Sequence, residues 1–391
     1  MKLLSSPLYA LGVAASFLVR RRESRWAFGC GSGLGEGALE LYGVARAADP
    51  TLRLVWLVRD KDELDSARQL GLTPVLRSSW KGFRATLNAR VLVVTHGLGD
   101  VNRFGTHGAF IVQLWHGIPL KKIQLDSPVT FGGPRILRGI LRALYRKNTS
   151  RIGVVPAASD TSADRLRTAF GLPAERVVVT GDPRDDVVFG DRDAAHELLA
   201  RSLGELPDGE IILYAPTWRD GDADPAVPTR AEWMAIAEYL ESASSVLVLR
   251  PHPHSVGDYS PGPTASPRIR MLPSSMQNDI NPVLPAVEAL ITDYSSIAFD
   301  FALLGRPIVF LAPDAEEYAR TRGLYEPFRD FSGGSEVSTW AGVLGLLNDP
   351  DAMTRLSAHA VHLADVHHRY RDGRNTSRVY DELRTRLGGQ E

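Results

Sequence analysis

The feature that most constrains the fold is the alternation, along most of the chain, of short runs rich in β-branched residues with stretches of helical periodicity. This alternation is typical of strands connected by crossover helices, and such strands pair in parallel. We therefore expect an α/β fold. The first set of expected strands comprises Trp26–Gly29, Leu52–Val58, Val91–Thr95, Ala109–Leu114, Ile152–Val155 and Val177–Thr180, with helical patterns such as Lys61–Leu70 and Thr161–Phe170 between them.

A second set of strands follows Gly181–Asp193, a stretch rich in turn residues that predicts a domain boundary between residues 185 and 186. Two parallel sheets facing each other form a cleft, and ligands of open α/β sheets bind beyond the carboxyl ends of the strands. Pro261–Pro267 is interpreted as an inserted loop. The second set comprises strands Ile211–Ala215, Val246–Arg250, Arg268–Met271, Ala289–Thr292 and Pro307–Leu311, with helices Arg230–Ser242, Ser295–Leu304 and Ser338–Leu347 between them.

The composition excludes several classes of protein. With 44% hydrophobic and 23% charged residues among 391, the chain is an ordinary globular sequence, which excludes disordered, collagen-like and disulfide-stapled proteins. The 45 Lys and Arg residues against 46 Asp and Glu give a net charge of -1, so no nucleic-acid partner is expected. The single cysteine, Cys30, excludes an intramolecular disulfide and a multi-cysteine metal site, and the visible residues require no metal or other cofactor.

Residues 7–19 form an apolar run near the N-terminus that Arg20, Arg21 and Arg22 follow directly. The run is too short to span a bilayer, and a secretory signal would place its positive charges before the apolar stretch. Two interpretations stay open: an anchor in the membrane plane with its arginines on anionic headgroups, and a first helix packed on the protein's own core. We favour the anchor and treat residues 1–22 as an amphipathic, membrane-associating segment.

Polar residues follow several of the expected strands. Ile111–Ile123 ends an apolar strand in Trp115-His116-Gly117, which places His116 at the cleft. An imidazole, with an ordinary pKa near 6.5, suits a general base. Lys121 lies on a following helical stretch that Pro119 can open, where it could meet phosphate. The alternative is a hydrogen-bonded structural histidine beside a solvated lysine.

Two strands of the second set end in basic motifs. Ile211–Asp220 leads into Thr217 and Arg219, which offer a hydroxyl and a planar guanidinium suited to phosphate. Val246–His254 ends in Arg250 and in His252, whose two flanking prolines restrict the local backbone. We interpret this as a rigid presentation of one imidazole, the alternative being a loop histidine stiffened by chance.

The strand Ala289–Thr292 leads into Asp293, and Ser295 and Ser296 then open an amphipathic helix. Hydroxyls beside the free backbone N–H groups of a helix N-terminus form an anion site that suits a nucleotide diphosphate. Simple N-capping by Ser295 or Asp293 is the alternative. The glycine-rich Cys30–Gly37 fits a dinucleotide motif only loosely, and we interpret it as a strand–helix turn whose backbone approaches an acceptor.

Taken together, these motifs resemble the CDP-glycerol:poly(glycerophosphate) glycerophosphotransferase family, which contains teichoic-acid primases and polymerases. The matching stretches are QLWHGIPLKKI, GDPRDDVVF, YAPTWRD, RPHP, ITDYSSIAFDFALLGRPIVF, RGLYEPF and DGRNTSRV. The resemblance implies a GT-B fold of two Rossmann-like domains: residues 23–185 for the acceptor and 186–391 for the nucleotide, with the last helices crossing back. It also implies a monotopic enzyme, which we place peripherally on the cytoplasmic face of the cell membrane.

The resemblance also implies roles for residues. His116 and His252 match the two family histidines implicated in the chemistry, and Thr217, Arg219, Arg250, Asp293, Ser295 and Ser296 match the donor-binding motifs. The implied reaction moves glycerol phosphate from CDP-glycerol to a hydroxyl of a lipid-linked saccharide or growing polymer, releasing CMP. Two alternatives stay open: a related transferase that uses CDP-ribitol or a nucleotide sugar, and a non-catalytic protein that binds the membrane surface.

Overall fold

The computed structural model describes residues 6–131, 133–219 and 222–388, which form two compact units. Unit 1 contains the residues up to His116, Arg135–Asp186 and the residues from Asp372 onward, and unit 2 contains Gly117–Pro134 and Val187–Arg371. The chain therefore passes from one unit to the other four times. The third passage, after Asp186, lies one residue from the boundary expected at the turn-rich stretch.

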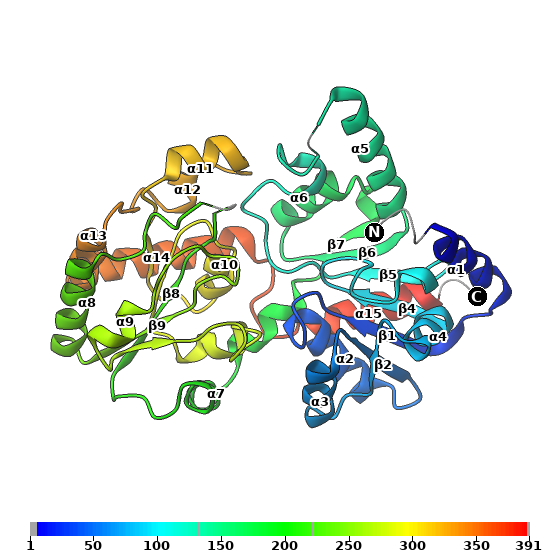
Figure 1. Cartoon of the computed structure of the whole chain (residues 1–391), viewed down its shortest axis with the longest axis horizontal. Helices are drawn as coiled ribbons and strands as arrows, with labels where there is room; N and C mark the ends of the chain where they lie inside the picture. The colour runs from blue at the N-terminus through cyan, green and yellow to red at the C-terminus, as the bar shows by residue number, and fades with distance from the viewer. Residues whose placement is uncertain (1–5, 132, 220–221, 389–391) are drawn as a thin grey trace. The chain divides into compact units, whose positions relative to one another are not determined.

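Unit 1 is built on a seven-stranded parallel sheet with the strand order β3-β2-β1-β4-β5-β6-β7 (Figure 1). The order reverses between β1 and β4, so the loops after these two strands border the crevice where open α/β sheets bind ligands. The strands are β1 (Arg22–Gly29), β2 (Arg53–Val58), β3 (Pro74–Leu76), β4 (Ala89–Val94), β5 (Phe110–Gln113), β6 (Ile152–Ala157) and β7 (Val177–Val179).

Helices complete unit 1, and the core between them and the sheet is rich in aromatic rings. Phe28 of β1 and Trp56 of β2 are both fully buried, and their rings stack with centroids 6.2 Å apart. The helices are α1 (Ser6–Leu18), α2 (Glu36–Ala48), α3 (Lys61–Gln69), α4 (Trp80–Asn88), α5 (Arg135–Thr149), α6 (Asp160–Phe170) and α15 (Asn375–Gly388), with 3₁₀ turns η1 (Arg103–Gly105) and η3 (Ala174–Arg176).

The last helix, α15, belongs to unit 1 although 185 residues of unit 2 separate it from Asp186. It packs against α2 and adds Val379 and Leu383 to the aromatic core. Its first turn is held by Asp186, whose carboxylate accepts the backbone N–H of Asn375 (2.9 Å) and of Thr376 (2.8 Å). The stretches GDPRDDVVF and DGRNTSRV thus hold the third and fourth crossings of the chain together.

Unit 2 repeats the same architecture with a five-stranded parallel sheet of order β10-β9-β8-β11-β12. Here the order reverses between β8 and β11. The strands are β8 (Glu210–Ala215), β9 (Ser245–Leu249), β10 (Ile269–Met271), β11 (Ala289–Thr292) and β12 (Ile308–Phe310). The helices are α7 (Arg192–Leu203), α8 (Arg230–Ser242), α9 (Pro261–Ala265), α10 (Ile297–Ala302), α11 (Ala315–Arg322), α12 (Phe328–Phe331), α13 (Trp340–Leu347) and α14 (Pro350–His367), with 3₁₀ turns η2 (Gln124–Asp126), η4 (Pro183–Phe189, across the boundary) and η5 (Asn281–Ala286).

All eleven expected strands are present, but three local expectations are wrong. The stretch after Pro119 is not helical, because it runs extended beside Leu324, with which Lys121 forms a β-bridge. Pro261–Pro267 is not a plain loop, since α9 begins there with a proline in its first turn. The short strand β3 was missed, because its three half-buried residues carry little periodicity.

The N-terminal segment agrees in part with both interpretations, the membrane anchor and the helix packed on the protein's own core. Residues 6–18 form a helix, and its Gly12 lies against the backbone of Phe104. Arg21 is not available for headgroups, because its guanidinium donates to the carbonyls of Thr86, Ala89, Gly105 and His107. Leu11 and Leu18 remain exposed. Among the described residues, no helix is both long and apolar enough to cross a membrane.

Candidate active site

In unit 2, the carboxyl ends of β8 and β11 carry a buried polar cluster at the point where the strand order reverses. The backbone N–H of Thr217 donates to the carboxylate of Asp293 (2.9 Å), and Arg219 donates to the other oxygen of the same carboxylate (3.0 Å). Parallel pairing of the two strands puts these residues side by side although 76 positions separate Thr217 from Asp293. The sequence prediction that these three residues share one site therefore has a geometric basis.

Arg219 is almost fully enclosed by its partners. Its Nε and Nη2 donate to the two carboxylate oxygens of Asp314 (2.8 and 2.9 Å), and Nη1 also donates to the carbonyl of Thr217. The guanidinium lies over the rings of Tyr294 and Tyr318. Burial alone would lower the pKa of Arg219, but hydrogen bonds and charge from the two carboxylates raise it above its ordinary value. Arg219 thus orders the loop. It does not present the unoccupied guanidinium fork that the sequence suggested.

Unlike the guanidinium of Arg219, the hydroxyl groups of this cluster are not fully engaged by neighbouring residues. The Thr217 hydroxyl is buried and makes no hydrogen bond of ordinary length and angle among the described residues, although it lies close enough to the Asp293 carboxylate to oppose the rise that burial causes in the pKa of that group. An unsatisfied buried polar group costs about 1–3 kcal/mol, so this position favours a polar ligand atom. Ser295 and Ser296 are half-buried, and the Ser296 side chain does not cap α10. The expected helix Ser295–Leu304 is shortened to Ile297–Ala302, so too few turns remain for a strong helix-dipole contribution.

Arg250 follows β9 and is likewise engaged by the protein. Its guanidinium donates to the carbonyls of Leu272 (3.2 Å), Gln277 and Asn278 (3.0 Å). Burial lowers the pKa of Arg250 to about 10, with Asp279 opposing the shift. These bonds fasten the end of β9 to the loop after β10, so Arg250 positions the segment that carries His252.

His252 lies in a cluster of three rings. Its ring stacks on Trp218 (centroids 5.6 Å apart) and contacts His254. The residue as a whole is exposed, yet desolvation of the ring, followed by the positive charges of His254, Lys121 and Arg250, lowers the pKa of His252 to about 4. The backbone N–H of His254 donates to Nδ1 (3.2 Å). An Nδ1 that accepts a hydrogen bond leaves the proton of a neutral imidazole on Nε2, so His252 is a neutral donor at pH 7.

In unit 1, His116 follows β5 in an unusual backbone conformation. Trp115 has a φ of 66°, a region that residues with side chains rarely adopt, and Gly117 follows with a φ of 110°. The indole of Trp115 is buried against Phe170 and also contacts the His116 ring. Such strain costs about 1–3 kcal/mol and clusters at functional sites. It turns the imidazole toward the carboxyl edge of the sheet.

A second histidine, His96, stacks on His116, and sequence reasoning missed it. The two rings are nearly parallel, with centroids 4.1 Å apart and an interplanar angle of 9°. His96 follows β4, and the hydroxyl of Thr95 lies 2.8 Å from its Nδ1. The buried carboxylate of Asp100 accepts the backbone N–H groups of this loop, including that of His96 (2.7 Å). The signal available in the sequence was a histidine directly after the expected strand Val91–Thr95.

The glycine-rich loop after β1 lies against the loop of His96. Thr95 donates to the sulfur of Cys30 (3.3 Å) and accepts the backbone N–H of Gly31 (3.2 Å). Ligand atoms of Cys30, Glu36 and His96 lie within 4.8 Å of one another, the one such group among the described residues. Burial, followed by the charge of Glu36, raises the pKa of the Cys30 thiol to about 12, which opposes the thiolate that a metal ion requires.

The predicted site residues are therefore divided between the units. His116 lies at the carboxyl edge of the unit 1 sheet, with His96 and the glycine-rich loop. Unit 2 contains all the others, Thr217, Arg219, Arg250, His252, Asp293, Ser295, Ser296 and Lys121.

The sequence profile of the CDP-Glycerol:Poly(glycerophosphate) glycerophosphotransferase family matches residues 28–385. The chain belongs to this family. It is similar to the teichoic acid ribitol-phosphate polymerase TarK of Staphylococcus aureus (strain NCTC 8325 / PS 47), with 29% identity over 279 residues, 70% of this chain and 52% of the relative. It is also similar to a teichoic acid glycerol-phosphate transferase of the same strain, with 27% identity over 306 residues and 76% of each chain covered.

The fold matches a solved structure of the wall teichoic acid polymerase TagF, with a TM-score of 0.79 over 98% of this chain and 94% of the other, at 21% identity. One TagF structure was obtained after a soak with CDPG. The expected α/β fold of GT-B type, with two parallel sheets, is thereby confirmed. The chain spans about half the length of the first curated relatives it matches, 52% and 47%.

Proposed function

We propose that the chain transfers glycerol phosphate from CDP-glycerol to a hydroxyl group of a lipid-linked saccharide or growing teichoic-acid-like polymer, with release of CMP. The observation that carries this proposal is the position of the family motifs. In both units, the histidines and the Thr217–Asp293 cluster follow the carboxyl ends of parallel strands, where folds of this type bind ligands.

In the proposed reaction, the acceptor oxygen attacks the phosphorus that bears the glycerol, and the bond from that phosphorus to CMP breaks. His116 takes the proton of the acceptor hydroxyl. His252 donates its Nε2–H to a phosphate oxygen without carrying charge, since its pKa lies well below 7. Transfers of this kind depend on positioning and charge stabilisation more than on covalent catalysis.

We assign donor binding to unit 2. The buried Thr217 hydroxyl, which makes no well-formed hydrogen bond among the described residues, supports this assignment, and the half-buried Ser295 and Ser296 follow the neighbouring strand β11. Lys121 adds positive charge beside His252. Arg219 and Arg250 hold the loops that carry these groups, so we assign them positioning roles.

A screen of CMP release tests the reaction. Purified full-length protein is incubated with CDP-glycerol, CDP-ribitol or a nucleotide sugar, each with and without a saccharide-lipid acceptor analogue. Acceptor-dependent CMP release from CDP-glycerol supports the proposal. Release from CDP-ribitol alone identifies the ribitol transferase, and product formation only from a UDP- or GDP-sugar identifies a glycosyltransferase. No turnover with any donor, together with vesicle binding, identifies a non-catalytic membrane-surface protein.

We also propose that the protein associates peripherally with a membrane, chiefly through α5. Five large apolar side chains of this helix are exposed, from 38% at Leu141 to 82% at Ile136. They fall on one face, and the arginines of the helix fall on the opposite face. An apolar face opposite a basic one is typical of helices that lie in the membrane interface. The exposed apolar residues of α5 are Ile136, Leu137, Ile140, Leu141 and Leu144.

Vesicle flotation separates α5 from the N-terminal helix. Ile136→Glu with Ile140→Glu should weaken binding about 100-fold, because two large apolar side chains are withdrawn from the acyl boundary. Truncation before Val19, which spares the structural Arg21, should have a smaller effect. Met234→Glu on α8, also exposed, is the matched control. Unchanged flotation of the α5 variant would place the membrane contact elsewhere.

A further inference from the structure

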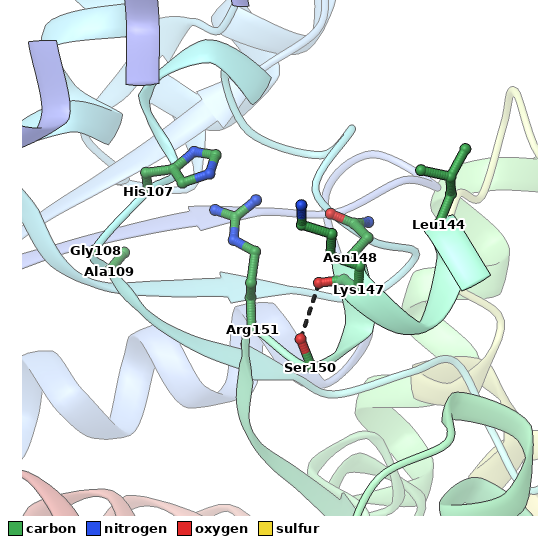
Figure 2. A pocket seen from close by; sticks show the side chains of 8 residues that line it. All are labelled: His107, Gly108, Ala109, Leu144, Lys147, Asn148, Ser150 and Arg151. Carbon is green, nitrogen blue, oxygen red and sulfur yellow. Dashed lines mark hydrogen bonds between the residues drawn. The ribbon is translucent and has the colours of Figure 1, made fainter. Parts of the chain in front are cut away.

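A pocket with a volume of about 700 Å³ lies at the amino ends of β5 and β6. His107 and Ala109 directly precede β5, and Arg151 directly precedes β6, while Leu144 and Lys147 come from the end of α5 (Figure 2). His116 follows the opposite end of β5. The four residues of β5 alone place its two ends roughly 13 Å apart. The pocket is therefore distinct from the proposed catalytic site at the carboxyl edge of the sheet.

The pocket concentrates positive charge. Its described lining includes the cations Arg151 and Lys147 but neither Asp nor Glu. The guanidinium of Arg21 adds a third positive charge nearby, since it donates to the carbonyl of the lining residue His107 (3.1 Å). Burial, followed by the charges of Arg151 and Arg21, lowers the pKa of His107, so this imidazole is neutral at pH 7 and contributes a polar group but no charge. Like charges gathered at a pocket repel one another, and a bound anion offsets that repulsion.

The pocket also adjoins the apolar face of α5. Leu144 lines the pocket and belongs to the exposed apolar residues of the helix. Lys147 lies three residues further, within the last turn of α5. A surface that joins an exposed apolar face to a basic pocket matches a phospholipid, whose acyl chains and phosphate lie side by side at the interface.

We propose that this pocket binds the phosphate of an anionic glycerophospholipid headgroup while the apolar face of α5 lies in the acyl boundary. The inference rests on the proposed membrane association and goes beyond it by naming a binding site and a lipid class. The bound lipid is not a reactant, because it is held at the amino edge of the sheet. It fixes the orientation of unit 1 on the bilayer.

Sedimentation with vesicles of phosphatidylcholine, with or without phosphatidylglycerol, provides the first test. Lys147→Ala with Arg151→Gln should lower binding to the phosphatidylglycerol vesicles about tenfold to thirtyfold, the worth of two basic residues at an anionic surface. Arg135→Ala with Arg138→Ala removes the same charge from the polar face of α5, outside the pocket, and should lower it only a few-fold. Equal losses in the two variants would show diffuse attraction and overturn the site.

The single variant Lys147→Ala guards against misfolding, because Lys147 is exposed. It should retain the unfolding temperature of the parent and lose several-fold in phosphatidylglycerol-dependent binding. Unchanged binding in this folded variant would count against the pocket.

Calorimetric titration distinguishes the sources of phosphate. Short-chain phosphatidylglycerol should bind the parent protein and the Arg135→Ala/Arg138→Ala variant but not the pocket variant, whereas inorganic phosphate should bind weakly. Strong binding of inorganic phosphate, with vesicle binding unaffected by the pocket variant, would overturn the lipid assignment.

CMP release with a soluble acceptor should be unchanged in all these variants. Absent vesicle binding by the parent would instead refute the membrane association itself.

Discussion

The loops at the point where the strand order reverses are joined by ion pairs in unit 2 and by neutral contacts in unit 1. In unit 2, the loops after β8 and β11 are joined by the buried ion pair of Arg219 with Asp293, and Arg219 also pairs with the half-buried Asp314 beyond β12. In unit 1, the loops after β1 and β4 are joined by weak neutral contacts through Thr95 and Cys30. A buried ion network fixes one loop geometry, because a displaced partner leaves an uncompensated charge. The neutral contacts of Thr95 impose no such constraint between the two unit 1 loops, although the buried Asp100 carboxylate orders the loop after β4 itself.

This difference fits the proposal that unit 2 binds the donor and unit 1 the acceptor. A nucleotide donor has constant shape and suits a fixed site, while an acceptor that lengthens or varies suits a site with an adaptable rim. We propose that the exposed imidazole of His96 and the half-buried Gly31 form part of that rim.

His116→Gln should lower single-turnover CMP release by about 10²-fold to 10⁴-fold, the usual range for a positioned acid–base group. Affinity for CDP-glycerol, measured by calorimetry, should stay nearly unchanged, because we assign donor binding to unit 2. A variant with normal turnover would return His116 to a structural role.

Arg219→Met should lower the free energy of unfolding by about 3–5 kcal/mol, since it leaves the buried Asp293 and the half-buried Asp314 without their cation. Urea denaturation measures this loss. The comparison variant is Thr95→Val in unit 1, for which we expect about 1 kcal/mol. Similar losses in the two variants would remove the contrast between the reversal points.

His252→Gln should lower turnover about tenfold, because glutamine retains one N–H donor for the phosphate. The pKa of His252, about 4, is below that of an unfolded histidine near 6.5, so folding favours the neutral form. The contribution of His252 to stability is therefore complete above pH 6.5 and is lost as the pH falls from 6.5 to 4. A general base must be neutral to accept a proton, so activity that depends on the proposed base His116 should fall as the pH drops through the range from 8 to 5. This fall should persist in the His252→Gln variant, and its disappearance would show that His252 titrates in that range.

Thr217→Val should have the smallest effect. Replacing the buried hydroxyl by a methyl group removes an oxygen that makes no well-formed hydrogen bond, so the free protein should be about as stable as the parent. Donor affinity should fall about fivefold to tenfold, the worth of one neutral hydrogen bond. Thermal unfolding with and without CDP-glycerol measures both. A loss of stability without a loss of affinity would contradict a ligand contact.

Strand ends could be located from sequence because apolar runs stop abruptly, which is why His116, His252 and Asp293 fall where expected. The partners of Arg219 and Arg250 could not be predicted. Asp314 lies 95 residues beyond Arg219, and the carbonyls around Arg250 belong to a loop whose course no periodicity indicates. His96 was missed for the same reason, since its importance depends on the pairing of β4 with β5. The spacing of the leucines and isoleucines in α5 already predicts an apolar face, but the longer apolar run at residues 7–19 is the stronger membrane signal in the sequence.

The fastening of α15 to Asp186 has a consequence for the order in which the protein folds during synthesis. Unit 1 is completed only by the residues from Asp372 onward, and at about 5–20 residues per second these emerge roughly ten to forty seconds after Asp186. Until then, the core positions that Val379 and Leu383 fill, against α2, stay uncovered. The later part of the chain, Val187–Arg371, can fold while the earlier part waits. A nascent chain that stalls before Asn375 therefore leaves part of the aromatic core of unit 1 exposed.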